Sequence, residues 1–420
     1  MLLLIITVEK ARYDRIKQNV DAFGVLCYTK CKMEMYIMKT IDLFCGCGGL
    51  SLGFQKCGYE IVGAFDYWDA AIECYSNNFD HQAQKLDLSK KNISLSVIRP
   101  LNPEIIIGGP PCQDFSSAGG RQEGERANLT ISFAKIIKSI KPKYFVMENV
   151  SRAQKSKAYT EAISIFEAAG YGLTEKVLDA SKCGVPQKRK RLFCIGALNE
   201  RANFLDAYLL NHQSIISMTV REYFNANNYG LDFDYYYRHP RTYSRRAIYS
   251  VDEPSPTVRG VNRPRPANYK QHKNDAEFND NISALTYQQR ALIQTFPADF
   301  NFGNNQALAE QMIGNAVPVN LASYVANALN EFVQREKTIS VDFPRWLITN
   351  HNFTDLAVKD TISRLNRCNK ILRIEKENIK SYINELEVNE WFKSLSVCVR
   401  SQIKRALTLY DEYRNQLKTE

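Results

Sequence analysis

Hydrophobic and polar positions follow two different periods along the first half of the chain. Short apolar runs such as "KTIDLFCG" (39–46) and "PEIIIGGPP" (103–111) predict buried strands that end in glycine or proline. Between such runs, segments such as "TISFAKIIKSIK" (130–141) place apolar residues at helical spacing. Strands that alternate with helices of this length predict an α/β fold with a mainly parallel sheet and helices on both faces.

This alternation stops near residue 199, and the change divides the chain into predicted regions. We expect a catalytic and cofactor-binding domain over 39–198, an irregular aromatic and basic region over 199–262, and a return to the first domain over 263–336. From 337 to 420 the apolar positions fall at helical spacing and predict a small helical appendage. Residues 1–38 form an N-terminal extension, and a cluster of methionines at its end leaves open that translation starts there.

Composition narrows the classes of function. The chain has 420 residues, 45% of them hydrophobic, and a net charge of +10, which is a mild bias toward polyanions such as nucleic acid. The 11 cysteines show neither paired CxxC spacing nor a Cys/His set, so we expect no zinc site and a reducing cytoplasm. The apolar start is too short for a signal peptide, and no apolar run is long enough to cross a membrane.

The first candidate site is the glycine-rich turn in "DLFCGCGGLSLGF" (42–54). Glycines such as Gly46 and Gly48 let the backbone approach a ligand closely, and the helix that follows offers amide donors. Asp66 ends the next predicted strand and can accept hydrogen bonds from ribose hydroxyls, while Asp87, one strand later, can read an adenine amine. The pattern predicts a cofactor that contains adenosine; a dinucleotide and a purely structural turn stay open.

The second candidate site is Cys112, within "GGPPCQDFSSAGG" (108–120). Pro110 and Pro111 restrict the backbone before the thiol, and glycines on both sides permit a loop that can approach a substrate. A thiolate is intrinsically nucleophilic and is favoured by nearby cations. A cysteine that only fills a gap in the core does not need this setting, so we predict a nucleophile.

A carboxylate and two guanidinium groups are candidates for the same crevice. Glu148, in "ENV", ends a predicted strand, where an apolar pocket would raise its pKa and let it hold or share a proton. The run "QKRKR" places Gln187, Arg189 and Arg191 at alternate positions, and therefore on one face of a strand. Guanidinium groups there can steady a thiolate, a carboxylate or a carbonyl oxygen. The alternatives are a structural acid and a solvated basic run.

The order of these stretches resembles that in DNA (cytosine-5)-methyltransferases of the bacterial restriction–modification type. The ordered set is "DLFCGCGGLSLGF", "GGPPCQDFS", "ENV", "QKRKR", "DEPSPTVRG" and "GNAVPVNLA", and it spans about residues 39–335. The resemblance implies a Rossmann-like methyltransferase sheet, S-adenosylmethionine as methyl donor, and a target cytosine swung out of the duplex. It also implies methylation of C5 through a covalent bond between Cys112 and C6 of the base.

The same resemblance implies roles for individual residues. Cys112 resembles the nucleophile, Glu148 the acid that engages N3 and the exocyclic amine, and Arg189 and Arg191 a basic pair with Arg191 nearest the base carbonyl. Phe44 is expected on the adenine, Asp66 on the ribose and Asp87 on the adenine amine; the full cofactor set is Phe44, Gly46, Gly48, Asp66, Tyr67, Asp87, Pro110 and Asn315. A target-recognition region is expected within 192–250, and the candidate DNA contacts are Ser116, Arg121, Gln187, Arg238, Arg241 and Arg245.

Two other functions stay open on the sequence. One is methylation of tRNA, although the "CFT"-type signature of that branch is absent, and the other is a catalytically silent DNA-binding relative. The silent relative would have lost Cys112, Glu148 or the glycine turn, and all three are present. We expect double-stranded DNA as the partner, a cognate restriction endonuclease in the same system, a monomer, no membrane, no metal, and a cytoplasmic location at the nucleoid.

Overall fold

The chain forms two compact units, residues 1–327 and 328–420. The predicted N-terminal extension falls, except for Met38, outside the residues that the structure describes. The computed structural model describes residues 38–111, 128–240, 242, 245–277, 281–336, 339, 342–369, 371 and 379–416.

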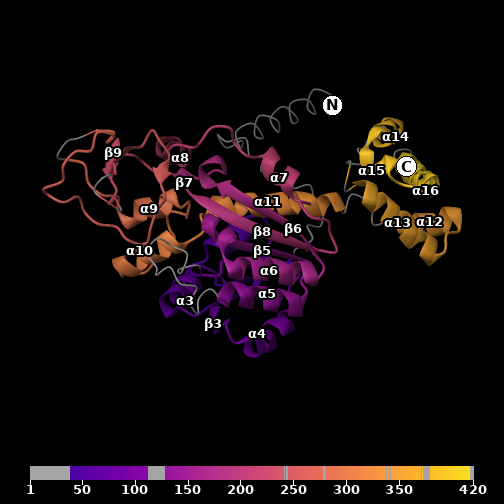
Figure 1. The fold of residues 1–420 in the computed structure, drawn as a ribbon, viewed down its shortest axis with the longest axis horizontal. Coiled ribbons are helices and arrows are strands. Elements are labelled where there is room, and N and C mark those ends of the chain that lie inside the picture. The colour runs from indigo at the N-terminus through magenta and orange to yellow at the C-terminus, as the bar shows by residue number, and fades with distance from the viewer. Residues whose placement is uncertain are drawn as a thin grey trace, which may run out of the picture. The chain divides into compact units, whose positions relative to one another are not determined.

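A seven-stranded sheet forms the centre of the first unit, in the order β3-β2-β1-β4-β5-β8-β6 (Figure 1). Neighbouring strands from β3 to β5 pair in parallel, whereas β8 pairs antiparallel with both β5 and β6. The predicted α/β fold with a mainly parallel sheet is therefore confirmed. The strands are β1 Lys39–Leu43, β2 Glu60–Asp66, β3 Ala83–Lys85, β4 Ile105–Gly108, β5 Tyr144–Val150, β6 Tyr171–Asp179 and β8 Lys190–Leu198.

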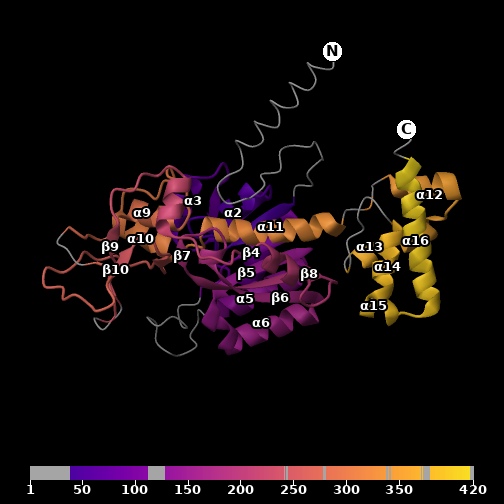
Figure 2. The ribbon, with the colours of Figure 1, turned by 90° about the horizontal axis from the view of Figure 1, so that it is seen from above.

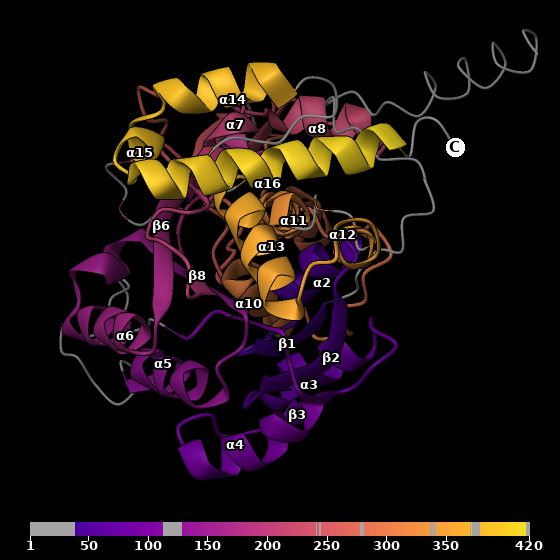
Figure 3. The ribbon, with the colours of Figure 1, turned by 90° about the vertical axis from the view of Figure 1, so that its right-hand side faces the viewer.

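Helices cover both faces of this sheet, because its parallel strands are apolar on both sides. In Figures 2 and 3, α5 and α6 lie on one face, with α4 beside them, and α2 and α11 lie on the other. Phe133, Phe145 and Phe166 join α5, β5 and α6, with ring centroids 4.2 to 6.4 Å apart. The helices are α2 Gly49–Lys56, α3 Asp69–Ser76, α4 Lys91–Ile98, α5 Asn128–Ile140, α6 Lys157–Ala168 and α11 Val319–Glu336.

The strand order indicates which edge of the sheet would bind a ligand. The chain winds from β1 toward β3 on one side and from β4 toward β5 on the other, so the order reverses between β1 and β4. Ligands of such sheets bind outside the carboxyl ends of the strands at this reversal. The glycine turn follows β1, and Pro110 and Pro111 follow β4. The glycine turn and the described start of the predicted Cys112 loop, which reaches Pro111, therefore lie at the same edge.

The region after β8 is built from short elements. β9 and β10 form an antiparallel pair, and β11 pairs in parallel with β7, which directly precedes β8. Apolar side chains of α8, α9 and α10 share one core with the turn after β1. The elements after β8 are α7 Asp206–Asn211, α8 Val220–Ala226, β9 Tyr235–Tyr237, β10 Ile248–Ser250, β11 Ser255–Pro256, α9 Tyr287–Ile293 and α10 Gln306–Asn315. The short elements before β8 are β7 Gln187–Lys188 and the 3₁₀ turns η1 Arg99–Leu101, η3 Ser151–Lys155 and η4 Ala180–Lys182.

The second unit is helical, as the sequence predicts, and has its own core. Phe343, Leu365, Leu386 and Leu407 are all buried within it. Figure 3 shows α16 crossing α13. Its helices are α12 Phe343–His351, α13 Asp355–Asn369, α14 Ile379–Val388, α15 Glu390–Lys393 and α16 Val397–Gln416. Across the described parts of both units, no helix has the length and apolar character required to cross a membrane.

Candidate active site

The glycine-rich turn after β1 adopts left-handed backbone conformations. Gly46 and Gly48 have φ values of 55° and 93°, and Phe44, which is not a glycine, has a φ of 62°. Such a conformation is costly for a residue with a side chain and is typical of functional turns. The Asp66 carboxylate holds the turn, because its Oδ2 accepts the amide of Gly46 at 2.8 Å. The acid predicted to bind ribose thus also fixes the predicted cofactor turn.

Asp66 keeps capacity to accept further hydrogen bonds. Its Oδ1 accepts the amides of Tyr67 and Trp68 at 2.7 and 2.9 Å, whereas Oδ2 accepts the amide of Gly46. Each carboxylate oxygen has two lone pairs, so Oδ2 can accept a hydroxyl group as well. Tyr67 is 66% exposed beside it. Asp87, at the next strand, has its pKa lowered by a hydrogen bond from Ser89 and therefore stays ionised.

The helix after the turn packs directly on a segment from late in the sequence. A Cβ atom at Gly49 would lie 2.3 Å from the carbonyl oxygen of Val317, and one at Gly53 would lie 2.4 Å from the Cβ of Ala322. Only glycine permits this approach, which brings "GNAVPVNLA" to the edge where the glycine-rich turn lies. Asn315, the last residue of α10 and a predicted cofactor contact, is exposed there.

A buried acid lies beneath the turn. The hydroxyl group of Ser51 donates to Oδ2 of Asp42 at 2.6 Å, while Oδ1 has no hydrogen-bond partner among the described residues. Burial raises the pKa of Asp42 to about 7, with nearby Asp66 adding to the effect and Ser51 opposing it. The sequence shows this acid within the motif but gives no sign that it is buried.

Glu148 and Arg191 form a shielded ion pair. Nε of Arg191 lies 2.9 Å from Oε1 of Glu148, and the two side chains are 15% and 11% exposed. Burial raises the pKa of Glu148, while the charges of Arg191 and Arg189 oppose the shift. A Cβ atom at Gly109 would lie 3.4 Å from Oε2 of Glu148. The chain leading toward Cys112 therefore passes beside this carboxyl group.

Arg189 and Gln187 have a different environment from Arg191. The guanidinium group of Arg189 is buried and donates to the carbonyl oxygens of Val258, Gly314 and Ala316 at 2.9, 3.0 and 3.0 Å. Gln187 is also buried; it donates to Gln294 and accepts the amide of Val258. Arg189 thus joins "QKRKR" to two distant stretches of backbone, and Gln187 joins it to the backbone at Val258 and to the side chain of Gln294.

Two further polar residues organise the site and were not predicted from sequence. Nδ2 of Asn149 donates to the carbonyl oxygen of Pro110 at 3.4 Å and so joins the end of β5 to the predicted catalytic loop. Gln294, the C-cap of α9, donates to the carbonyl oxygens of Ile313 and Ala316. "ENV" contained the signal for Asn149, whereas no local pattern in the sequence marked Gln294.

The remaining predicted residues are divided between described and undescribed parts of the chain. Pro110 is buried at the carboxyl end of β4. Arg238 is half-buried and donates to the carbonyl oxygen of Thr257 at 2.8 Å, and Arg245 is exposed. Four predicted residues lie outside the described residues: Cys112, Ser116, Arg121 and Arg241. Within the described chain, no group of histidine, cysteine and acidic residues is arranged to hold a metal ion.

Comparisons with known proteins identify the family. Residues 38–331 match the C-5 cytosine-specific DNA methylases. The Type II methyltransferase M.HgiDI of Herpetosiphon aurantiacus is 54% identical over 305 residues, which cover 71% of this chain and 96% of that protein. M.HindV of Haemophilus influenzae is 51% identical over 298 residues, or 70% of this chain and 97% of that protein.

Solved structures show the same fold at low sequence identity. The Dnmt2 methyltransferase of S. pombe has a TM-score of 0.55 and 17% identity, covering 71% of this chain and 98% of that one. The Entamoeba histolytica methyltransferase EhMeth has a TM-score of 0.54 and 20% identity, covering 71% and 99%. The family match and the close relatives confirm the predicted enzyme class and do not favour the tRNA-methylating or silent alternatives. This chain belongs to the C-5 cytosine-specific DNA methylases.

Proposed function

We propose that this chain transfers the methyl group of S-adenosylmethionine to C5 of a flipped-out cytosine within a specific sequence of double-stranded DNA. The family supplies the reaction class, DNA cytosine C5 methylation. The observation that carries the finer proposal is the shielded Glu148–Arg191 pair, 2.9 Å apart, at the edge where the glycine turn and the chain toward Cys112 lie. An acid and a cation held together there suit a polar, planar base.

The residues in and around the glycine-rich turn fit S-adenosylmethionine. Phe44 offers an aromatic side chain for the adenine, Asp66 has a lone pair left for a ribose hydroxyl, and Asp87 is ionised and can accept from the adenine amine. The amides of the turn before α2 offer donors at a helix N-terminus. When bound, this cofactor supplies an electrophilic methyl group.

Glu148 and Arg191 are suited to activate the base. C5 of cytosine is a poor nucleophile until a sulfur–carbon bond forms between the Cys112 thiolate and C6. The raised pKa of Glu148 lets its carboxyl group carry a proton to N3, which takes up the electron pair displaced from the C5–C6 bond. In the proposed reaction Arg191 binds the carbonyl oxygen of the base. C5 then takes the methyl group with departure of a neutral thioether. Its proton passes to solvent, the Cys112 thiolate leaves C6, and the N3 proton returns to Glu148, which restores the ring.

In the proposed reaction Arg189 holds Arg191 in position and does not touch the base. Its donors hold the carbonyl oxygens of Val258, Gly314 and Ala316, and so fix the strand that carries Arg191. Arg191, two residues later, is thereby presented to Glu148. We propose Arg191 as the catalytic member of the predicted pair and Arg189 as its positioning residue.

Incorporation of label into DNA tests the reaction. Purified protein is incubated with labelled S-adenosylmethionine and unmethylated genomic DNA, and the product is sequenced after bisulfite treatment. Resistant cytosines in one short sequence are expected, and Cys112→Ser should abolish them while cofactor binding persists. Labelling of tRNA alone, or of neither nucleic acid, would overturn the proposed substrate.

We also propose a protective role in a restriction–modification system. The relatives are Type II methyltransferases by name, which supports a cognate endonuclease with the same recognition sequence. A monomer suffices for a reaction on one strand, and a DNA substrate favours a location at the nucleoid. DNA from cells that express the chain should resist an endonuclease encoded beside its gene, and light scattering should give a single-chain mass.

A further inference from the structure

A buried ion pair in the first unit takes no part in the proposed chemistry. Arg290, in α9, pairs with Glu310, in α10, and the two side chains are 6% and 7% exposed. Removing two charges from water costs free energy, so a buried ion pair is by itself weak evidence of a stabilising role. The other hydrogen bonds of these two residues show which part of the chain they hold.

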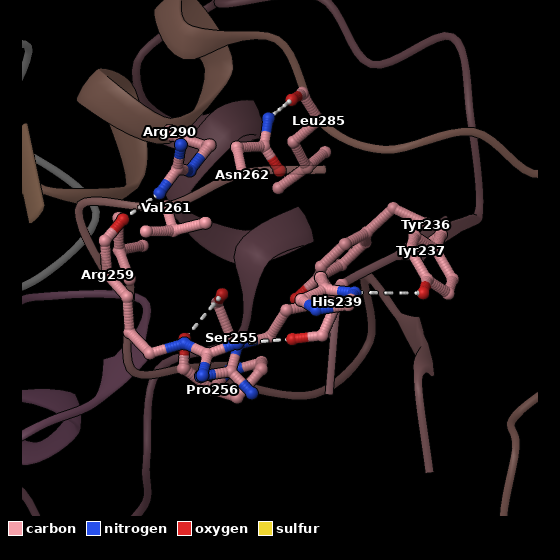
Figure 4. Close-up of a pocket in the computed structure, with 12 residues that line it drawn as sticks. Tyr236, Tyr237, His239, Ser255, Pro256, Arg259, Val261, Asn262, Leu285 and Arg290 are labelled. Carbon is pink, nitrogen blue, oxygen red and sulfur yellow. Dashed lines mark hydrogen bonds between the residues drawn. The ribbon is translucent and has the colours of Figure 1, made fainter. Parts of the chain in front are cut away.

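The ion pair holds the chain at Arg259 and Asn262. Nη1 of Arg290 donates to Glu310, while Nη2 donates to the carbonyl oxygen of Arg259, as the dashed line in Figure 4 shows. Oε1 of Glu310 accepts the side-chain amide of Asn262 at 3.1 Å, and the same amide donates to the carbonyl oxygen of Leu285 at 2.8 Å. The pair thus fixes the backbone of one residue and the side chain of another, three positions later.

The held segment lies directly on the backbone of "GNAVPVNLA". A Cβ atom at Gly314 would lie 2.0 Å from the amide nitrogen of Gly260 and 2.2 Å from the carbonyl carbon of Arg259, so position 314 has no room for a side chain. Arg189 donates to the carbonyl oxygens of Val258 and Gly314. Arg189 and the ion pair therefore hold two adjacent carbonyl groups, those of residues 258 and 259.

The same segment is joined to the irregular region in which target recognition is predicted. The guanidinium group of Arg259 donates to the carbonyl oxygen of His239, and that of Arg238 donates to the carbonyl oxygen of Thr257 at 2.8 Å. Arg238 and His239 directly follow β9. Arg259 therefore links two parts of the enzyme, because its side chain contacts the predicted recognition region while its backbone is held by Arg290.

We propose that Arg290 and Glu310 are positioning residues that keep the recognition region in register with the active site. Contacts to the correct bases raise the rate only when they form together with the reaction at the flipped cytosine. A loosened connection therefore slows methylation of the correct sequence more than that of a mismatched one, because only the correct sequence gains from these contacts. The inference rests on the proposed function and assigns residues that govern its sequence discrimination.

Competition between two duplexes tests this role. One duplex carries the methylation sequence found by bisulfite sequencing, and the other differs from it by one base pair. Both are mixed with labelled S-adenosylmethionine, and the ratio of their initial methylation rates gives the discrimination. The amount of folded enzyme does not affect this ratio, because both duplexes react with the same molecules.

Two altered proteins remove the connection in different ways. Arg290→Lys keeps a cation beside Glu310, but its single nitrogen cannot also reach the carbonyl oxygen of Arg259. Arg290→Met combined with Glu310→Leu replaces the ion pair by apolar side chains, a change that often preserves stability. We expect the discrimination of both proteins to fall by about tenfold, which is within the range that one mismatched base pair typically causes.

Ile137→Ala is the matched control for stability. Ile137 is fully buried in α5, and its truncation leaves a cavity that should lower the urea midpoint without changing the discrimination. The proposal is overturned if Arg290→Lys and the apolar double variant discriminate as the wild type does, or if Ile137→Ala loses discrimination as they do. An absence of DNA methylation by the unaltered protein would instead refute the proposed function.

Discussion

Replacing Arg189 with lysine separates a positioning role from a catalytic one. The two terminal nitrogens of the guanidinium group reach different acceptors: Nη1 donates to Val258, and Nη2 donates to Gly314 and Ala316. Lysine ends in a single nitrogen, which cannot occupy both positions. Arg189→Lys therefore leaves at least one of these carbonyl oxygens without its partner in a buried place.

The expected cost follows from how many of these hydrogen bonds the substitution removes. A hydrogen bond to a charged group contributes about 1.5–3 kcal/mol, so removing one lowers the free energy of unfolding by about 2 kcal/mol and removing two lowers it by about 4 kcal/mol. Arg191→Lys is the matched control, because the Arg191 side chain is 15% exposed and has Glu148 as its ion-pair partner. That substitution keeps a cation beside Glu148 and should therefore lower the free energy of unfolding by less than Arg189→Lys does.

Urea unfolding and steady-state methylation are measured on both variants. Arg189→Lys should lower the midpoint of the first unit's unfolding transition with an unchanged slope, and the protein that stays folded should also lose kcat, because Arg191 is no longer held in position. Arg191→Lys should keep the midpoint and lose kcat. A stable but inactive Arg189→Lys protein would refute the positioning role and return Arg189 to the catalytic group.

Three further predictions concern the acids of the site. Glu148→Gln should lower kcat by about 10²–10⁴-fold. The kcat of the wild-type protein should fall as pH rises through the raised pKa of Glu148, and this fall should disappear in the variant. An unchanged pH profile would contradict the proton-carrying role. Asp42→Asn should stabilise the protein at pH 8 but not near pH 4. Folding raises the pKa of Asp42 from 3.8 to about 7, so ionisation of Asp42 above that value destabilises the folded state. Equal urea midpoints for the variant and the wild-type protein at pH 8 would contradict this. Asp66→Ala should weaken binding of S-adenosylmethionine by tenfold or more in calorimetry, since it removes the acceptor for the Gly46 amide; an unchanged dissociation constant would remove Asp66 from the cofactor site.

The sequence by itself determined the elements and the order of the motifs. Apolar runs that end in glycine or proline marked β1 and β4 because buried parallel strands need no polar face. Glycines at 46 and 48 indicated a turn that can approach a ligand closely, and the structure gives both residues positive φ values. The order of the motifs was sufficient to identify the family, because that order depends on residue type and spacing alone.

The tertiary structure decided how the polar side chains of the motifs divide between chemistry and packing. Alternation in "QKRKR" predicted one shared face for Gln187, Arg189 and Arg191, yet the first two are buried on backbone groups and the third pairs with Glu148. The acceptors of Arg189 lie 69 to 127 residues away in sequence, so no local pattern could reveal them. Burial of Asp42 likewise depends on segments brought together only by folding, because desolvation is a property of three-dimensional packing.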